Sequence, residues 1–347
     1  DIDKIVSRYQ SSLLKLRGET IARTEAGAAL NFGRQTHAED IAAEAGAEVW
    51  KRWESGPDDG RQRESHTEAD GQTVRSDKPF IVLPPGKAPA CRLAVMTYSF
   101  REFPFFEAVD RSKALGAKYL EAHAWQKLSD DYPDAELNYK APPAAIEATK
   151  RKLADAGIKL VGYYFHQLGK DAAETRNVFA FCRTMGVENI VCEPDPATLP
   201  LLDRLAAEYG VNVAIHNHPR DAGHPEYVNW NPDEVLKQLR GCSRRIGACA
   251  DTGHWVRSGV DPVEALKKYQ GRTLCLHLKD IEKPTVDSRD VPWGTGIGNC
   301  KAVLAELHRQ TFAGVISIEY EHNPRDNMKD IAECIAFFNK VQAELGG

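Results

Sequence analysis

Histidine, aspartate and glutamate residues recur near the ends of short apolar runs in the second half of the sequence. Four successive runs end in such residues: His216 and His218, Asp251 and His254, His277 with Lys279 and Asp280, and Glu319 with Glu321. Imidazole nitrogens and carboxylate oxygens are the donors that divalent metal ions take in proteins. A bound ion of this kind polarises carbonyl and hydroxyl oxygens, so the pattern predicts metal-assisted chemistry on a small, oxygen-rich molecule.

Other polar residues occupy similar positions and extend the predicted site. Glu193 ends an apolar run and, with His216 and Glu319, is a candidate base. Lys279 follows His277 by two residues and therefore lies on the same strand face, where it could hold or protonate a substrate oxygen. The alternative for Lys279 is a structural ion pair with Asp280 or a nearby carboxylate.

A second set of residues is expected at the mouth of the site. Glu121 and His123 share one strand face and should line the mouth, and His218 is a further candidate for substrate binding. Trp125 and Trp293 stand at loop positions where an indole could stack on a sugar ring, although packing at a rim explains such a residue equally well.

The elements that must position these residues alternate between strand-like and helix-like runs. Eight strands are predicted, at 93–100, 118–124, 159–167, 189–194, 211–218, 247–255, 273–280 and 314–321. Amphipathic segments between them predict crossover helices and hence parallel strands. A doubly wound open sheet would also alternate, but no glycine-rich phosphate turn follows the first strand. The fold class is therefore α/β, a (β/α)8 barrel over residues 93–347, whose chemistry belongs at the carboxyl ends of its strands.

Composition limits the partners. The chain has 347 residues, of which 42% are hydrophobic, and a formal net charge of -5. We therefore expect the protein to bind a small molecule and to bind neither nucleic acid nor an anionic membrane. The sequence leaves open whether the protein forms a homo-oligomer. The eight cysteines form no C-x-x-C pair and are expected to be reduced. No apolar run approaches membrane-spanning length, and the expected compartment is the cytoplasm, although the chain begins at Asp1 and a leader could have been removed.

The amino-terminal part has a different character. Residues 1–80 are predicted to be a small, mostly helical appendage, and the prolines and glycine of residues 81–92 mark a linker. The appendage contains Ile-Ala-Arg-Thr-Glu at 21–25, Lys51-Arg52-Trp53, and Asp70-Gly71. Through these motifs the appendage resembles the tailed-phage head-morphogenesis (minor head) family, and this resemblance suggests a fusion. The alternative is a helical appendage that packs on the barrel or its oligomer.

The barrel also resembles a known family. The carrying motifs are VAIHNHP (213–219), ADTGHW (250–255), LHLKD (276–280), VPWGTGIGN (291–299) and ISIEYE (316–321). Through them, residues 91–347 resemble the xylose-isomerase-like superfamily of sugar phosphate isomerases and epimerases. The resemblance implies a bound Mn²⁺, Co²⁺, Mg²⁺ or Zn²⁺ held by Asp251, His277 and Glu319, with Glu321 as the substitute for Glu319. It also implies that His254 binds substrate.

The sequence departs from this family at the fifth strand, where His216 replaces the usual glutamate ligand. We take His216 as the fourth ligand, or as a base if it is not one. Since an epimerase of this family uses two metal-bound carboxylates, the substitution favours a lyase or isomerase acting on a sugar or keto-sugar through proton abstraction next to a carbonyl. Phosphate recognition is open, because the glycines of 294–298 could offer backbone N–H groups to it.

Three alternatives remain at this point. The first is a sugar or sugar phosphate epimerase of the same superfamily. The second is a catalytically idle barrel that serves as an interaction module through its phage-like segment. The third is an endonuclease-like barrel, against which the acidic pI of about 6.2 argues, since such enzymes bind DNA through basic loops.

Overall fold

The computed structural model describes residues 50–52, 73–75 and 91–346. The chain divides into two compact units, Asp1–Lys87 and Ala88–Gly347. In the first unit, β1 (Trp50–Arg52) pairs antiparallel with β2 (Thr73–Arg75), within the appendage that the sequence predicted to be mostly helical. Most of that appendage lies outside the described residues.

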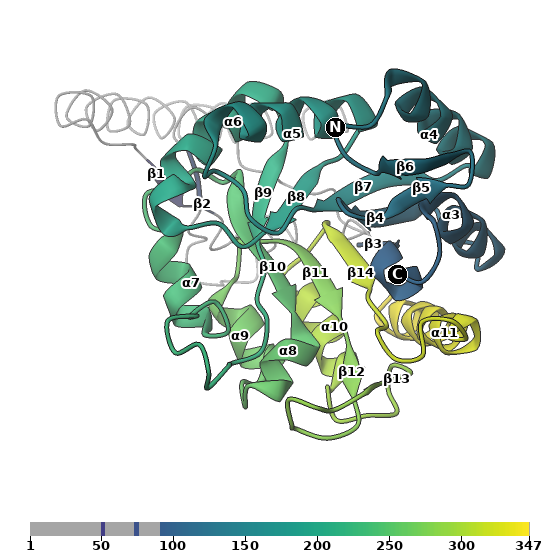
Figure 1. The fold of residues 1–347 in the computed structure, drawn as a ribbon. Helices are drawn as coiled ribbons and strands as arrows, with labels where there is room; N and C mark the ends of the chain where they lie inside the picture. Colours follow the sequence, from purple (N-terminus) through teal and green to yellow (C-terminus); the bar gives the residue numbers. More distant parts are fainter. Residues whose placement is uncertain (1–49, 53–72, 76–90, 347) are drawn as a thin grey trace, which may run out of the picture. The chain divides into compact units, whose positions relative to one another are not determined.

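The second unit is a closed barrel of eight parallel strands, as predicted (Figure 1). In ring order the strands are β3 (Arg92–Met96), β4 (Tyr119–His123), β7 (Lys159–Tyr164), β8 (Asn189–Cys192), β9 (Asn212–Ile215), β10 (Ile246–Asp251), β11 (Thr273–Leu278) and β14 (Val315–Ile318). Ring order equals chain order, and β14 closes the barrel on β3. Each strand therefore ends at the same face of the barrel.

Helices surround the barrel, as Figure 1 shows. They are α3 (Phe105–Ala114), α4 (Pro143–Ala156), α5 (Ala172–Met185), α6 (Leu199–Tyr209), α7 (Pro232–Gln238), α8 (Thr252–Arg257), α9 (Pro262–Lys268), α10 (Cys300–Arg309) and α11 (Met328–Glu344). The unit also contains two short hairpins, β5 (Lys127–Ser129) with β6 (Tyr132–Glu136) and β12 (Asp280–Ile281) with β13 (Asp290–Val291). Two 3-10 turns are present as well, η1 (Thr97–Phe100) and η2 (Pro196–Thr198).

The core has two layers, because alternate strand residues face opposite sides of the barrel wall. Ala94, Val161, Val191 and Cys275 belong to a small cluster, and a much larger apolar cluster includes the buried helix residues. Glycine ends the helices α4, α5 and α6 in the left-handed region, for example Gly157 at φ 68°. These glycines let the chain turn directly from the helix into the connection to the next strand.

Several strands end earlier than the sequence predicted. The run 247–255 stops being strand at Asp251, because the Asp251 side chain accepts a hydrogen bond from the His254 backbone N–H and begins α8. The run 93–100 likewise turns into η1 after Met96. These early ends place side chains such as His254 on a helix at the rim.

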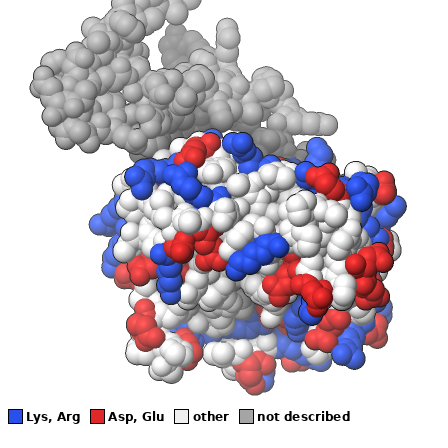
Figure 2. Space-filling view, turned by 45° about the horizontal axis from the view of Figure 1, so that its top comes forward, with Lys and Arg blue, Asp and Glu red and all other residues white. Residues whose placement is uncertain are grey.

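The surface of the second unit carries both signs of charge. On the face drawn in Figure 2, Lys and Arg side chains are interspersed with Asp and Glu over the described residues. That face lacks, in its described part, the continuous basic surface typical of nucleic-acid binding. Among the described residues, no helix combines the length and apolar character needed to cross a membrane.

Candidate active site

Four ligand-type side chains meet inside the barrel at the ends of β9, β10, β11 and β14. They are those of His216, Asp251, His277 and Glu319, and each offers one nitrogen or oxygen within 4.8 Å of the others'. His277 Nδ1 lies 3.1 Å from Glu319 Oε2, and His216 Nε2 lies 3.6 Å from Asp251 Oδ2. All four are buried. The structure thus brings together the residues for which the sequence predicted a common position.

Asp251 is held in place through both its backbone and its side chain. The Asn217 side chain donates to the Asp251 carbonyl (3.0 Å) and accepts from the Asp251 N–H (2.9 Å). Asp251 Oδ1 caps α8, so Oδ2 is the oxygen left to face the other three residues. Asn217 was missed at the sequence level, where it is merely the residue between two histidines.

Glu121 orients His277. Its Oε1 lies 2.8 Å from His277 Nε2, and its Oε2 accepts from the Ser317 hydroxyl at 2.6 Å. Because a carboxylate only accepts, Nε2 carries a proton and Nδ1 faces the other ligand-type residues. The sequence placed Glu121 at the mouth of the site, but it is 1% exposed and lies against Gly162, where a Cβ would come within 2.7 Å of its side chain.

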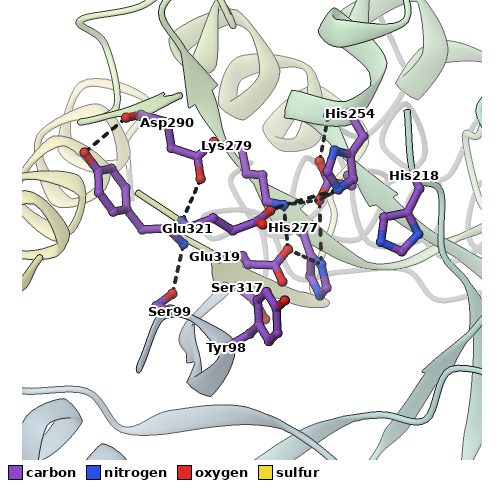
Figure 3. A network of polar contacts seen from close by, with 12 residues as sticks. Tyr98, Ser99, His218, His254, His277, Lys279, Asp290, Ser317, Glu319 and Glu321 are labelled. Atoms are coloured by element: carbon purple, nitrogen blue, oxygen red, sulfur yellow. Dashed lines mark hydrogen bonds and ion pairs between the residues drawn. The ribbon is translucent and has the colours of Figure 1, made fainter. Parts of the chain in front are cut away.

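Lys279 lies among three carboxylates, as Figure 3 shows. Its Nζ is 3.0 Å from Asp251 Oδ2 and 2.8 Å from Glu319 Oε2, and it also contacts Glu321. Burial lowers the pKa of Lys279, but these carboxylates outweigh it and raise that pKa well above its usual value. The structure therefore favours the ion-pair interpretation of Lys279. One ammonium among three carboxylates leaves two negative charges, which a divalent cation would neutralise.

The polar atoms that face the centre of the cluster test whether a metal fits. His216 Nε2 is buried and forms no hydrogen bond among the described residues, and a buried polar atom costs about 1–3 kcal/mol unless a partner satisfies it. Asp251 Oδ2 and His277 Nδ1 have ion-pair contacts within the cluster, to Lys279 and Glu319. Two imidazoles and two carboxylates converging in this way suit Zn²⁺, Mn²⁺, Co²⁺ or Mg²⁺. The donor set is consistent with a divalent metal.

The protonation state of His277 would be coupled to metal binding. Burial lowers the pKa of His277, but Glu121 and Glu319 on its two sides raise it well above its ordinary value. Without a metal the ring therefore carries both protons, and binding of an ion at Nδ1 would release one of them. Burial alone raises the pKa of Glu319, but Lys279 and His277 hold it well below its usual range, so this carboxylate is ionised.

Glu193 contacts a second set of rings. Its Oε1 lies 3.4 Å from His216 Nδ1, contacts His218 Nδ1, and accepts from the Tyr164 hydroxyl at 3.0 Å. Burial raises the pKa of Glu193, but the hydrogen bonds from the two histidines lower it well below its usual value. His216 therefore stands between Glu193 on one side and Asp251 on the other, and Glu193 holds both rings.

His254 projects from α8 and is held by a charged pair. Arg257 Nη1 lies 3.2 Å from His254 Nδ1, and Arg257 Nη2 donates to Asp290 Oδ1 at 2.6 Å. Lys279 Nζ lies 3.4 Å from the other ring nitrogen, Nε2, so a cationic donor stands beside each nitrogen of the His254 ring. Burial is the main cause of the pKa of His254 lying well below the ordinary value. Arg257 and Asp290 were not identified from the sequence.

A cavity of about 310 Å³ opens on this cluster. Aromatic residues form much of its wall: Tyr98, Trp125 and Tyr164. His216, His254, Glu319 and Glu321 also line it. We call it the inner cavity. The sequence suggested Trp125 for such a wall but did not identify Tyr98 or Tyr164, although both are aromatic residues close to strand ends.

The remaining sequence candidates occupy different places. Trp293 is buried in the core, with its backbone N–H 3.5 Å from the Cys334 sulfur, and does not line the inner cavity. This position matches a packing role for Trp293, in the core rather than at the rim. His123 is 2% exposed, its ring lies 4.6 Å from that of Trp125, and neither ring nitrogen has a hydrogen-bond partner among the described residues.

A second cavity of about 1210 Å³ adjoins the first and shares His166 and His218 with it. We call it the outer cavity. Most of its wall comes from the loops that follow β7, β8 and β9, including Pro194 and Tyr227, and Val286 from the loop between β12 and β13 adds to it. Tyr227 fixes the loop after β9, since its hydroxyl accepts from the His218 backbone N–H at 2.6 Å. His218 thus lies at the boundary between the cavities.

Comparison with known proteins agrees with this picture. Residues 197–341 match the family model described as Xylose isomerase-like TIM barrel, and residues 1–96 match that described as Phage Mu protein F like protein. Both resemblances stated from the sequence are thereby confirmed. An inosose dehydratase of Clostridium botulinum (strain Alaska E43 / Type E3) is 29% identical over 140 residues, which cover 35% of this chain and 45% of that protein. The match thus spans less than half of this curated relative.

Solved structures resemble the barrel over nearly their whole length. An uncharacterized protein from Parabacteroides distasonis ATCC 8503 is 33% identical, with a TM-score of 0.59 over 72% of this chain and 98% of that one. The structure of IolI protein with a binding zinc atom is 18% identical, with a TM-score of 0.58 over 73% of this chain and 99% of that one. At that lower identity the likeness shows the fold alone.

Proposed function

Because the chain belongs, through its barrel, to the xylose isomerase-like TIM barrel family, we propose that it is a divalent-metal-dependent lyase or isomerase acting on a keto-sugar. The observation that carries this proposal is the buried group of His216, Asp251, His277 and Glu319 beside the inner cavity. The name of one curated relative, inosose dehydratase, supports an elimination.

The proposed reaction begins with loss of a proton from the carbon next to a carbonyl. A divalent ion held by the four residues would act as a Lewis acid toward substrate oxygens. Glu319 is the proposed base, because its carboxylate is ionised and lines the inner cavity. Glu193 contacts His216, and we assign it to holding this proposed metal ligand in position. Lys279 is 1% exposed, so it acts through the carboxylates it contacts.

In the lyase reaction two bonds to carbon break and one carbon–carbon double bond forms. The C–H bond next to the carbonyl breaks and its proton passes to Glu319. Its electron pair forms the carbon–carbon double bond, and the C–O bond β to the carbonyl breaks. The departing oxygen takes up a proton from water, and the hydroxide left behind takes the proton from Glu319, which restores the carboxylate. In the isomerase reaction no group departs: Glu319 returns the proton to the former carbonyl carbon, and the hydroxyl proton of the carbon that lost it passes to the former carbonyl oxygen.

The inner cavity is suited to hold a keto-sugar. His254 lines the inner cavity, where its imidazole can form a hydrogen bond with a substrate hydroxyl. The rings of Trp125 and Tyr98 can pack on the apolar face of a sugar and displace water from it. These contacts would orient the carbonyl toward the cluster.

The experiment compares metal-free protein with protein reloaded with Mn²⁺, Co²⁺, Mg²⁺ or Zn²⁺. With methyl 3-keto-glucoside in deuterium oxide, proton abstraction appears as deuterium exchange next to the carbonyl. An ultraviolet band from the unsaturated ketone identifies the lyase, and a rearranged sugar without that band identifies the isomerase. Inversion of one carbon alone would instead identify an epimerase.

Variants separate the chemistry from folding. Glu319→Gln should abolish exchange, whereas Glu147→Gln, which changes an exposed glutamate paired with Lys150, should leave it unchanged. Undiminished activity after complete removal of metal would refute the proposal. The absence of exchange with every metal would favour the idle barrel that serves as an interaction module.

A further inference from the structure

A second group of ligand-type side chains lies where the inner and outer cavities meet. Glu193 follows β8, His218 follows β9 and His166 follows β7. His218 Nδ1 contacts Glu193 Oε1, and His166 Nδ1 lies 3.9 Å from the same oxygen. All three residues line the outer cavity, and His166 and His218 line the inner cavity as well. An ion in the outer cavity can therefore reach all three.

His216 belongs to the buried cluster with Asp251, His277 and Glu319, although it also touches this second group. Its Nε2 lies 3.6 Å from Asp251 Oδ2, and its Nδ1 lies 3.4 Å from Glu193 Oε1. A neutral imidazole has one N–H and one nitrogen without a proton. If Nε2 binds an ion in the buried cluster, Nδ1 keeps its proton and donates it to Glu193 in a hydrogen bond. The second group then needs its third ligand from another residue.

His166 can supply that third ligand. Its side chain is 55% exposed, and the centres of the His166 and His218 rings lie 6.4 Å apart. The His218 side chain is 44% exposed. Because neither ring is enclosed in the core, both can turn until a nitrogen of each faces the Glu193 carboxylate. The His216 side chain, by contrast, is 2% exposed and stays with the buried cluster.

Two imidazoles and one carboxylate are a ligand set that suits Zn²⁺ or Co²⁺. Catalytic zinc sites hold the ion through three protein ligands of these types and leave a fourth position to water or substrate. Imidazole nitrogen suits such ions better than Mg²⁺, which takes oxygen ligands. Because Glu193, His166 and His218 line the wall of the outer cavity, the remaining position of a bound ion would face that cavity.

The charge of the outer cavity also favours a cation. The charged residues that the structure describes in its wall are four acids and two bases: Glu193, Asp195, Asp221, Glu226, Lys170 and Arg220. Both bases are engaged by neighbours. Lys170 Nζ donates to the Gln167 side chain at 2.6 Å. The Arg220 guanidinium lies 5.1 Å from the centre of the Trp230 ring. A concave wall with an excess of one sign of charge raises the local concentration of ions of the other sign.

We propose that Glu193, His166 and His218 form a second divalent-metal site at the junction of the two cavities, which takes Zn²⁺ or Co²⁺ in preference to Mg²⁺. The second site shares no ligand with the buried cluster, and Figure 3 shows the His218 ring apart from Lys279. An ion bound there would hold an oxygen of a small molecule in the outer cavity. This inference goes beyond the proposed function, which needs only the ion of the buried cluster, and it does not depend on that function.

The test counts the ions bound per chain. Metal-free protein is dialysed to equilibrium against Zn²⁺, Co²⁺ or Mg²⁺, and elemental analysis gives the number of ions bound. We expect the wild type to bind two Zn²⁺ or two Co²⁺ per chain and no second Mg²⁺. Asp251→Asn, which changes the buried cluster alone, should lose one Zn²⁺ and keep the other.

Variants of the two half-exposed histidines assign the second ion. His166→Gln and His218→Gln should each bind one Zn²⁺ fewer than the wild type, and the thermal unfolding of the metal-free protein should not change, because neither side chain is enclosed in the core. His224→Gln is the matched control. His224 also lines the outer cavity, and its Nδ1 lies 3.1 Å from Glu226 in an exposed pair. The control should bind as many ions as the wild type.

The outcomes distinguish this inference from the proposed function. A wild type that binds a single Zn²⁺ per chain would overturn the inference and leave the proposed function in place. A second ion that survives in both His166→Gln and His218→Gln, or that is lost in His224→Gln, would overturn it as well. If Asp251→Asn binds as many ions as the wild type, the proposed function fails, and the loss of one ion in His166→Gln and His218→Gln would still support the second site.

Discussion

Replacing Glu121 by glutamine should weaken metal binding without disturbing the fold. The side chain keeps its size, and its amide oxygen can still accept from His277 Nε2, while its NH₂ group can donate to the Ser317 hydroxyl. What the change removes is the negative charge behind the imidazole, which makes the ring a better donor to a metal. We expect the Kd for Mn²⁺ or Zn²⁺ to rise about 10- to 100-fold, which corresponds to about 1.4–2.8 kcal/mol.

The pH dependence of that loss follows from the structure. Glu121 and Glu319 raise the pKa of His277, against burial, so in the metal-free chain a proton competes with the ion for Nδ1. Glu121→Gln lowers that pKa, so a proton competes less strongly with the metal for His277. This effect partly offsets the weaker binding of the metal by the imidazole. The offset grows as the pH falls, so the variant should lose more affinity relative to wild type at pH 8 than at pH 6.

The assay is competition with a fluorescent chelator at both pH values, with thermal unfolding as the check on folding. Glu107→Gln is the matched control, because Glu107 carries the same functional group in an exposed ion pair with Arg111. A Kd within threefold of wild type at pH 8, in a variant that unfolds normally, would show that Glu121 does not orient a metal ligand.

Three further outcomes are expected. Gly162→Ala places a Cβ 2.7 Å from Glu121 Cγ, so it should weaken metal binding as Glu121→Gln does and, in urea titration, lower the free energy of unfolding by about 1–3 kcal/mol. Burial lowers the pKa of His123 from 6.5 to about 4, so acidification favours the unfolded chain, which takes up the proton. Between pH 7 and pH 5, metal-free wild type should lose about 2 kcal/mol more stability than His123→Phe, and equal losses would contradict this. Metal at 100 times its Kd should stabilise the fold by about 2.7 kcal/mol, so chelation should lower Tm by roughly 5–11 °C in calorimetry; an unchanged Tm would speak against a metal site.

The sequence predicted that the ligand-type residues lie close together, because the barrel places them by a simple rule. His216, Asp251, His277 and Glu319 each stand near a strand end, and closing the ring brings neighbouring strand ends together. It predicted individual contacts less well. Glu121 has the same side chain as Glu319, but only the register of β4 against β7 shows that it lies beneath the site and against Gly162.

The loop glycines and the tryptophans show the same limit. Gly294, Gly296 and Gly298 look free to bind an anion until the fold brings Asp280 among their N–H groups. Trp125 and Trp293 are equivalent by loop position, yet one is 44% exposed at the inner cavity and the other is 3% exposed in the core. Local sequence carries no information on which neighbour fills the space beside a side chain.

The sequence by itself determined the alternation of eight strands with helices, and hence the barrel and the face that carries the chemistry, because periodicity and turn residues act over a few neighbouring positions. The tertiary structure alone decided which nitrogen of His277 faces the cluster, where the charge of Lys279 lies, and how the two cavities join. Those features arise between residues far apart in the chain, such as Glu121 and His277, 156 positions apart, whose contact exists only once the ring of strands has closed.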